Sequence, residues 1–434
     1  MMPTDAITAR FAPLHPRRID LSLGRIERLL RDLGSPHKRL PPVIHVAGTN
    51  GKGSTVAFMR AALEAAGKRV HVYTSPHLVR FNERIRLAGA LVDDERLADA
   101  FDRCETANAG QSISVFEITT AAAFLLFSET PADALLLEVG LGGRFDATNV
   151  IDAPAATVVT PVSYDHLEFL GSTLEKIAYE KAGILKRGAP AIVAEQEDSA
   201  LKVIEREALK AGAPRIVAGR DFFVRAENGR LIFEDRDGLL DLPLPRLAGR
   251  HQHGNAATAI AALRAIHPEL TNKTFERGVL DADWPARLQR LRGGPLTALA
   301  PVQAEIWLDG AHNEAGGRVL AEAMADFEDQ SPRPLALICG SLTNKDTAGF
   351  LGHFRGLAQE TLAVPIAGEH AARSAQEVAA IARAAGLSAA ACDSVASALR
   401  FLAARQWPVP PRILIAGSLY LAGAVLEENG AAPR

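Results

Sequence analysis

Residues 43–67 read VIHVAGTNGKGSTVAFMRAALEAAG, which combines an apolar run, a glycine-rich turn and a helical pattern. The run Val43–Ala47 is almost continuously apolar, and this is typical of a parallel strand that is buried on both faces. The turn that begins at Gly48 leads into a helix expected over Ser54–Ala66, which Gly67 would end. The order strand, glycine-rich turn, lysine and helix predicts a phosphate-binding loop in a doubly wound α/β domain.

The turn supplies the chemistry for holding a polyphosphate. Its backbone N–H groups and the helix N-terminus donate hydrogen bonds, and Lys52 adds positive charge near the β- and γ-phosphates. The candidate phosphate-binding residues are Thr49, Asn50, Gly51, Lys52, Gly53 and Ser54. The turn departs from the pattern G-x-x-x-x-G-K-[ST], because Gly53 stands where a Ser or Thr is expected. A tight turn that joins strand to helix without a ligand is the alternative interpretation.

The same alternation of apolar runs and helical patterns continues along the chain. Strands are predicted at 43–47, 69–73, 134–139, 157–160, 191–194, 305–308, 335–339 and 412–416, and helices at 54–66, 174–182, 255–266, 314–327, 376–385 and 395–404. This order predicts parallel sheets with helices on both faces. Residues 221–245 differ, because Asn228-Gly229 and Asp237-Gly238 are hairpin signals, and they predict a small antiparallel β insertion.

A second interruption is the glycine- and proline-rich stretch LRGGPLTALAP, residues 291–301. Such composition is typical of a domain boundary. We therefore place a larger domain, which contains the P-loop, at residues 1–294 and a smaller, Rossmann-like α/β domain at residues 295–434, close to the usual domain size.

Composition narrows the function classes. With 48 basic and 51 acidic residues the net charge is −3, which gives no strong attraction to nucleic acid or to an anionic membrane. No apolar segment reaches the ~18 residues that span a bilayer, and the N-terminus lacks a signal-peptide core. Cys104, Cys339 and Cys392 have no paired spacing, which fits a reducing cytosol. We expect a cytoplasmic protein that acts on small molecules.

Polar residues follow several predicted strands. Glu138 ends the run LLLE, Ser75 follows the strand that ends at Tyr73, and His166 follows the strand that ends at Thr160. Ligands of α/β proteins bind at the carboxyl ends of strands, so these side chains could converge on one or two Mg²⁺ ions. The alternatives are a turn-capping carboxylate for Glu138 and a structural hydrogen bond for His166.

Lys181 is an unexpected residue for its helix. Ser172–Glu175 has the form of a capping box and Gly183 is a stop signal, so a helix is predicted between them. Lys181 would share the apolar face with Ile177 and Ala178, where burial would lower its pKa. A neutral amine there could react with CO₂ and form a carbamate, an anion suited to Mg²⁺. A snorkelling or ion-paired lysine is the simpler interpretation of the residue alone.

Further polar residues stand where a nucleotide could be contacted. Asn255 opens the predicted helix over 255–266, either as its cap or as an amide that faces a base. Arg287 precedes the domain boundary, and Asp309 and His312 follow the predicted strand at 305–308. Asp309 could accept hydrogen bonds from ribose hydroxyls, and His312 could reach a phosphate. Each of these could also be an ordinary turn residue.

Motif strings spread over most of the chain point to one family. They are HVAGTNGKGS, YTSPHLVRFNERI, LEVGLGGRFDATN, DHLEFLGSTLEKIAYEKAGI, GRHQHGNAATAI, WPARLQ and LDGAHN. In order and spacing, from Leu14 onward, the sequence resembles the folylpolyglutamate synthase/dihydrofolate synthase family of Mur ligases. GTNGKGS alone indicates the wider Mur ligase family, whereas its combination with SPHL, EKAG and DGAHN is specific.

The resemblance implies an ATP-dependent ligase that adds L-glutamate to dihydropteroate, to the γ-carboxylate of reduced folates, or to both. ATP would phosphorylate the acceptor carboxylate, and the glutamate amine would displace phosphate from the acyl phosphate. The C-terminal domain would be the glutamate-ligase domain of this family. The implied cofactors are ATP, two Mg²⁺ ions and a carbamate on Lys181. Members of this family are mostly monomers, which implies a monomer here.

The resemblance also assigns roles residue by residue. The phosphates would be held by Thr49, Asn50, Gly51 and Lys52, and Mg²⁺ by Ser75, Glu138, His166 and carbamylated Lys181. ATP would be contacted from both sides of a cleft by Asn255, Arg287 and Asp309. The catalytic residues would be Lys52, Lys181 and His312, the last near the phosphates or the incoming amine. The pterin would be held by Leu14, His15, Pro16, Phe145, Asp146 and Ala147, although Pro16 replaces a small polar residue of some bifunctional members.

Two other functions fit parts of the sequence. Another Mur-type ligase would keep the phosphate loop and Lys181, but it usually has an N-terminal uridine-nucleotide domain, for which the residues before Gly48 leave no room. A P-loop ATPase that binds partners without ligation would not need Asn255, Arg287 and Asp309. The residues do not decide between dihydropteroate and reduced folate as the acceptor.

Overall fold

The computed structural model describes residues 10–11, 14, 22–369 and 371–433, and the chain divides into two compact units. The first unit comprises Met1–Arg246 and Gln252–Asp283, and the second comprises Leu247–His251 and Trp284–Arg434. The boundary therefore precedes the one predicted after residue 294. The physical reason is that β12 (Gln289–Leu291) pairs antiparallel with β13 (Glu305–Leu308), so residues before the Gly-Pro stretch already belong to the second sheet.

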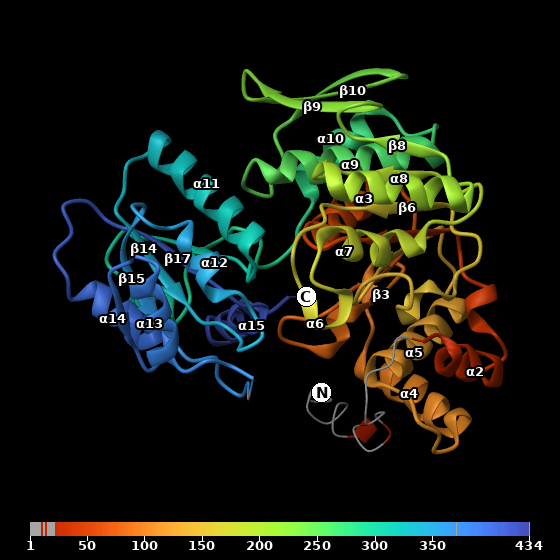
Figure 1. The fold of residues 1–434 in the computed structure, drawn as a ribbon, viewed down its shortest axis with the longest axis horizontal. Helices are drawn as coiled ribbons and strands as arrows, with labels where there is room; N and C mark the ends of the chain where they lie inside the picture. The colour runs from red at the N-terminus through yellow and green to blue at the C-terminus, as the bar shows by residue number, and fades with distance from the viewer. Residues whose placement is uncertain (1–9, 12–13, 15–21, 370, 434) are drawn as a thin grey trace. The chain divides into compact units, whose positions relative to one another are not determined.

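An eight-stranded sheet forms the centre of the first unit (Figure 1). Its strands are β1 (Val43–Ala47), β2 (Val70–Tyr73), β3 (Ile85–Leu87), β4 (Ala90–Leu91), β5 (Ala134–Glu138), β6 (Ala156–Val159), β7 (Ala191–Val193) and β8 (Arg215–Val217). They lie in the order β4-β3-β2-β5-β1-β6-β7-β8. The strands from β2 to β8 in this order run parallel, whereas β3 and β4 add an antiparallel extension at one edge.

Helices bury this sheet on both faces. They are α2 (Gly24–Asp32), α3 (Lys52–Ala65), α4 (Asp94–Asn108), α5 (Val115–Glu129), α6 (Leu167–Leu170), α7 (Leu174–Lys181), α8 (Asp198–Ala211), α9 (His251–Ile266) and α10 (Asn272–Asp281), with short 3₁₀ turns η2 (Pro36–Lys38), η3 (Phe81–Arg84), η4 (Ala147–Val150) and η5 (Ala182–Ile184). Val43 and Leu135 pack in one core with α2, α4 and α5, and Val159 packs in another with α7 and α8. Successive strand residues face opposite sides, so the buried Ile44 and Val158 line the other face. The predicted doubly wound architecture is confirmed.

The predicted antiparallel insertion is also present. It consists of β9 (Phe222–Glu227), β10 (Arg230–Asp235) and β11 (Gly238–Pro243), in the order β11-β10-β9 (Figure 1). Asn228 and Gly229 both have positive φ, at 51° and 74°. Two adjacent residues with positive φ build the tight turn that matches the twist of a hairpin, which explains why Asn-Gly stands there.

The second unit contains a six-stranded sheet in the order β12-β13-β17-β14-β15-β16, parallel from β13 to β16. Its remaining elements are β14 (Leu335–Cys339), β15 (Ala358–Ala363), β16 (Ala389–Ala391), β17 (Arg412–Ala416), η6 (Thr297–Leu299), α11 (Glu314–Gln330), α12 (Thr347–Gly352), α13 (Ala375–Ala384), α14 (Val395–Ala403) and α15 (Leu419–Glu428). Leu337, Cys339 and Leu414 form its core with residues of α11, α12 and α13. This is the predicted Rossmann-like α/β arrangement. In the described part of the chain, no helix has the length and hydropathy of a membrane span.

Candidate functional site

Four neighbouring parallel strands bring most of the predicted site of the first unit to one edge of the sheet. The strands β2, β5, β1 and β6 are adjacent, and Val46 of β1 pairs with Glu138 of β5. Ser75, Glu138, the phosphate loop and His166 each lie at or just beyond the carboxyl end of one of them. Because the carboxyl ends of parallel strands share an edge, residues remote in sequence meet where α/β proteins bind ligands.

The phosphate loop is fixed by the segment that follows β6. The amides of Thr49 and Asn50 donate to the carbonyl of Pro161 at 3.0 and 3.2 Å. The hydroxyl of Thr49 donates to the Ser163 carbonyl at 3.0 Å and accepts from the Ser163 amide at 3.1 Å, and the Asn50 amide contacts the Ser163 hydroxyl. Ser163 was not among the predicted residues, although it is a polar residue beyond a strand end, which is the signal that singled out His166.

Gly51 ends the loop in a conformation that requires glycine. Its φ is 88°, and α3 begins at the next residue, Lys52. A Cβ at Gly51 would also collide with the side-chain oxygen of Asn255. Glycine is therefore required here both by the positive φ and by the lack of space for a Cβ. With glycine in place, the first turn of α3 keeps its N–H groups directed at the loop.

Lys52 and Glu138 form the charged centre of the loop. The Lys52 ammonium donates to the carbonyls of Gly48 and Thr49 at 3.1 and 3.3 Å. Its Nζ lies 3.9 Å from Glu138 Oε1, and both side chains are mostly buried. The lysine predicted to face phosphate and the acid predicted to face Mg²⁺ are therefore neighbours. The alternative interpretation, a tight turn that binds no ligand, does not by itself explain why a carboxylate is buried beside this loop.

Lys181 is buried at the last residue of α7, as the spacing predicted. Only 5% of the residue is exposed, and its Nζ donates to the carbonyl of Gly48 at 2.9 Å. Burial, helped by the positive charge of Lys52, lowers the pKa of Lys181 to about 7, while Asp165 and Asp146 oppose the shift. The snorkelling interpretation does not fit this position, because the amine faces the phosphate loop rather than solvent.

His166 and Ser75 approach the same edge from either side of the loop. His166 has a positive φ of 51° and its side chain is 39% exposed, while its amide donates to Asp165 Oδ1 at 2.8 Å. Ser75 is partly buried and follows β2. The described residues include no group of three or more His, Cys, Asp or Glu side chains that could hold a metal ion. The predicted ligand set has only two such residues, Glu138 and His166, and relies on a hydroxyl and a modified lysine for the others.

Asp146 is the centre of a buried hydrogen-bond chain. Its Oδ1 accepts from the hydroxyl and the amide of Thr148 at 2.5 and 3.0 Å, and its Oδ2 accepts from the Leu141 amide at 2.8 Å. The Thr148 hydroxyl lies 2.8 Å from His45 Nε2. Burial raises the pKa of Asp146, against these bonds, and lowers the pKa of His45 to about 3. The single proton of Thr148 goes to the carboxylate, so the neutral His45 ring donates through Nε2.

The other residues predicted to hold a pterin are only partly placed. Phe145 is 43% exposed and Ala147 is buried at the start of η4. Leu14 packs against the core of α4 and α5, and its carbonyl accepts from the Ile113 amide at 3.0 Å. His15 and Pro16 lie outside the described residues.

Asn255 lies inside its helix rather than at the start. The helix α9 begins at His251, so the prediction of a helix start and cap at Asn255 was wrong. The polar run before Asn255 continues the helix instead of preceding it. Its side-chain amide donates to Gln252 Oε1 at 3.0 Å, and its oxygen faces Gly51 of the phosphate loop. Asn255 is therefore placed beside the loop by a residue one turn earlier on the same helix.

The second unit gathers Arg287, Asp309 and His312 around the carboxyl end of β13. Asp309 is buried, and its two oxygens accept from the amides of Leu288 and Ala311, each at 2.7 Å. Burial raises the pKa of Asp309, which Arg287 opposes. Arg287 Nη1 donates to the Ala286 carbonyl at 2.8 Å. Asp309 thus fixes the conformation of two turns besides any contact with a ligand.

His312 is held in one ring orientation. Its Nδ1 lies 2.9 Å from the carbonyl of Gly310, and because a carbonyl only accepts, Nδ1 carries a proton. In the neutral ring Nε2 is then the basic nitrogen.

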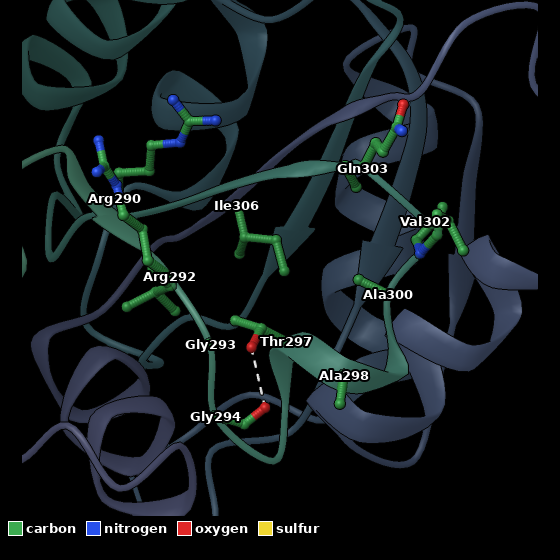
Figure 2. A pocket seen from close by; sticks show the side chains of 13 residues that line it. Arg290, Arg292, Gly293, Gly294, Thr297, Ala298, Ala300, Val302, Gln303 and Ile306 are labelled. Atoms are coloured by element: carbon green, nitrogen blue, oxygen red, sulfur yellow. Dashed lines mark hydrogen bonds between the residues drawn. The ribbon is translucent and has the colours of Figure 1, made fainter.

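A surface hollow elsewhere in the second unit contains none of the predicted residues. It has a volume of about 750 Å³ and lies between β12 and the start of β13, around Arg290, Arg292, Thr297 and Ile306 (Figure 2). It lies toward the amino end of β13, whereas Asp309 follows the carboxyl end of the same strand.

Known proteins resemble this chain along most of its length. The Mur ligase middle domain family matches residues 46–263. A dihydrofolate synthase/folylpolyglutamate synthase of Bacillus subtilis (strain 168) is 39% identical over 332 residues, which cover 70% of this chain and 71% of the relative. The protein of the same description from Escherichia coli (strain K12) is 37% identical over 364 residues, covering 84% of this chain and 82% of the relative.

Solved structures of proteins from the same family also superpose on this chain. Escherichia coli FolC in complex with DHPP and ADP superposes with a TM-score of 0.87 at 33% identity, over 98% of this chain and 97% of that chain. A bifunctional folylpolyglutamate synthase/dihydrofolate synthase with Mn, AMPPNP and L-glutamate bound gives a TM-score of 0.84 at 30% identity, over 98% of each chain. These matches show that the chain belongs to the dihydrofolate synthase/folylpolyglutamate synthase family and contains the middle domain of the Mur ligases.

Proposed function

We propose that this protein is an ATP-dependent amide ligase that joins L-glutamate to dihydropteroate, giving dihydrofolate, and to the γ-carboxylate of reduced folates. The observation that carries the proposal is the meeting of Lys52, Glu138 and Lys181 around the phosphate loop. Relatives of this family have been solved with ADP and with AMPPNP, Mn and L-glutamate, which are the ligands such a reaction needs.

The reaction proceeds in two transfers. The acceptor carboxylate attacks the γ-phosphate of ATP, which gives an acyl phosphate and ADP. The amino group of glutamate then attacks the acyl carbon, and the tetrahedral intermediate expels phosphate as the amide forms and a proton leaves the nitrogen. Phosphoryl transfer depends on positioning and charge neutralisation. Lys52 and the amides at the start of α3 supply both for the phosphates.

The residues around the loop fit a divalent metal. Glu138 is a buried carboxylate whose Oε1 lies 3.9 Å from Lys52 Nζ, and it would ligand Mg²⁺ together with Ser75, His166 and Lys181. Mg²⁺, as two ions, would neutralise phosphate charge when bound. Lys181 would contribute as a carbamate, formed when its neutral amine adds CO₂ and releases a proton. Its buried position and its bond to the Gly48 carbonyl support this modification.

The remaining assignments are proposals about contacts with substrates. Asn255, Arg287 and Asp309 contact ATP, and His312 acts near the phosphates or the incoming amine. The pterin is held by Leu14, His15, Pro16, Phe145, Asp146 and Ala147. The protein works in the cytoplasm on small molecules, which its near-neutral charge and the unpaired spacing of its cysteines support, and it works as a monomer, as the resemblance implies.

The first experiment measures glutamate-dependent ADP release by the purified protein, separately with dihydropteroate and with tetrahydrofolate. Turnover with both is the expected result. Turnover with one alone would overturn the dual activity and assign the enzyme to that acceptor. Bound ATP without turnover on either acceptor would overturn the proposal. Lys52→Met should abolish turnover, whereas Lys68→Met, which removes a lysine just beyond the far end of α3, should not.

A second experiment tests the modified lysine. Lys181→Ala should abolish ligation, and a short-chain carboxylate should restore part of it by replacing the missing carbamate. Full activity of Lys181→Ala without any added carboxylate would contradict the role of Lys181.

A further inference from the structure

Residues 140–149, which form the loop after β5 and most of η4, are hydrogen-bonded to the carboxyl end of α7 and the turn that follows it. The Arg144 amide donates to the Glu180 carbonyl at 2.8 Å. The Asn149 amide group donates to the carbonyls of Arg144 and Gly183 at 2.9 and 3.1 Å. The last carbonyls of a helix lack partners within the helix, so donors from another segment fix where that helix ends.

The Arg144 side chain completes this junction. Its guanidinium lies over the ring of Tyr179, 3.9 Å from the ring centre, and donates to the Tyr179 carbonyl at 3.2 Å. The same group pairs with Glu207 of α8 at 3.0 Å. A Cβ at Gly183 would collide with Arg144, so glycine there lets the arginine backbone approach α7 closely. Arg144 therefore joins three segments: its own loop, the last turn of α7, and α8.

The position of Lys181 depends on this last turn of α7. Lys181 is the final residue of the helix, directly after Tyr179 and Glu180, whose carbonyls Arg144 holds. Its amine reaches the Gly48 carbonyl from there. A helix end without these donors would fray, and a displacement of about 1 Å can cost up to about a hundredfold in rate when a group must meet its partner in one geometry.

We propose that Arg144 is a positioning residue for Lys181. It holds the end of α7 so that the amine faces the phosphate loop, where it can take up CO₂ and keep the carbamate. This inference rests on the proposed function, because it assumes that Lys181 works as a carbamate. Arg144 itself touches no substrate in this scheme.

The experiment compares Arg144→Met with Arg206→Met in the full-length protein. Arg206 also contacts Glu207, at 3.4 Å, but no carbonyl of α7 is bonded to it among the described contacts, so its loss tests the pairing of Glu207 alone. The first readout is the ¹³C NMR carbamate signal after equilibration with ¹³C-bicarbonate. The second is kcat and the KM for ATP, measured across a series of bicarbonate concentrations.

We expect Arg144→Met to lose most of the carbamate signal and to lower kcat by about tenfold or more, with the KM for ATP within about twofold of wild type. Added bicarbonate should restore part of kcat, because a misplaced lysine needs more CO₂ to be modified. Arg206→Met should behave as wild type. Arg144→Lys, which keeps the charge but not the planar stacking on Tyr179, should fall between the two and covers the case in which Arg144→Met does not fold.

Two results would overturn the inference. One is a wild-type carbamate signal and kcat in Arg144→Met, and the other is an equal loss in Arg206→Met. Wild-type protein that ligates glutamate with no carbamate signal would instead overturn the role proposed for Lys181, and this inference with it. Wild-type protein that ligates nothing would overturn the proposed function itself.

Discussion

Thr148→Val should show how much the buried hydrogen-bond chain of the first unit contributes to stability, apart from the packing of the same side chains. Valine nearly matches threonine in shape but lacks the hydroxyl that joins His45 to Asp146. That hydroxyl donates to Asp146 Oδ1 at 2.5 Å and lies 2.8 Å from His45 Nε2. Thr148 and His45 are both fully buried, so water cannot replace the lost group.

The expected cost follows from the partners left behind. The His45 N–H loses its acceptor, and the Asp146 carboxylate loses its hydroxyl donor but keeps its backbone amide donors, among them those of Leu141 and Thr148. A buried polar group without a partner costs about 1–3 kcal/mol, and a charged one more, so the free energy of unfolding should fall by about 2–4 kcal/mol. The loop should still fold, because its backbone bonds to Asp146 remain.

Urea unfolding followed by far-UV circular dichroism measures this loss. Thr148→Ser is the control, because it keeps the hydroxyl and removes one buried methyl group worth about 1 kcal/mol. The three tryptophans, Trp284, Trp307 and Trp407, all belong to the second unit, so tryptophan fluorescence reports on that unit alone. A loss below about 0.5 kcal/mol for Thr148→Val, which is the usual size for a neutral surface change, would refute the reasoning. A larger loss for Thr148→Ser than for Thr148→Val would do the same.

Three further outcomes can be checked with the same protein. Gly51→Ala should weaken ATP binding by at least about tenfold in calorimetry, because φ is 88° and the new Cβ meets Asn255; unchanged binding would show that the loop adapts. In CO₂-free buffer, the stability of wild type relative to Lys181→Met should rise with pH between about 7 and 10.5, since the folded pKa is lowered to about 7 and the unfolded chain then binds more protons; a flat difference in urea midpoints would contradict this. Asp309→Asn should lower the free energy of unfolding that the tryptophan signal reports in urea by about 1–3 kcal/mol, because an amide NH₂ would face a backbone N–H of Leu288 or Ala311; an unchanged free energy of unfolding would count against that geometry.

Local patterns were enough to predict the phosphate loop and the strand ends. The strand Val43–Ala47 and the start of the next helix depend on continuous apolar residues and a glycine turn, both visible within a short window. Lys181 could be placed on a buried face because helix spacing puts it above Ile177 and Ala178. These features are present in the structure because tertiary packing favours the same strand, turn and helix that the local sequence favours.

Other features depend on contacts between distant segments. The helix α5, VFEITTAAAFLLFSE, was not predicted because it is buried nearly all round and so lacks an amphipathic period. The start of α9 at His251 is not marked by a capping pattern. For this reason the helix was predicted to start too late, at Asn255. Arg144 was missed for a further reason: Glu207 and Tyr179, its partners, lie far along the chain, and only the folded structure brings them together.

The route of the chain between the two units bears on how the protein is made. All strands of the first sheet precede Leu247, yet Leu247–His251 belongs to the second unit, and Ala248 packs against a core built from residues beyond Asp283. A growing chain folds from its N-terminus, so this segment leaves the ribosome before the sheet that receives it exists. A gene divided after Asp283 would leave Ala248 on the wrong fragment. The two units are therefore poor candidates for exchange as separate cassettes between relatives.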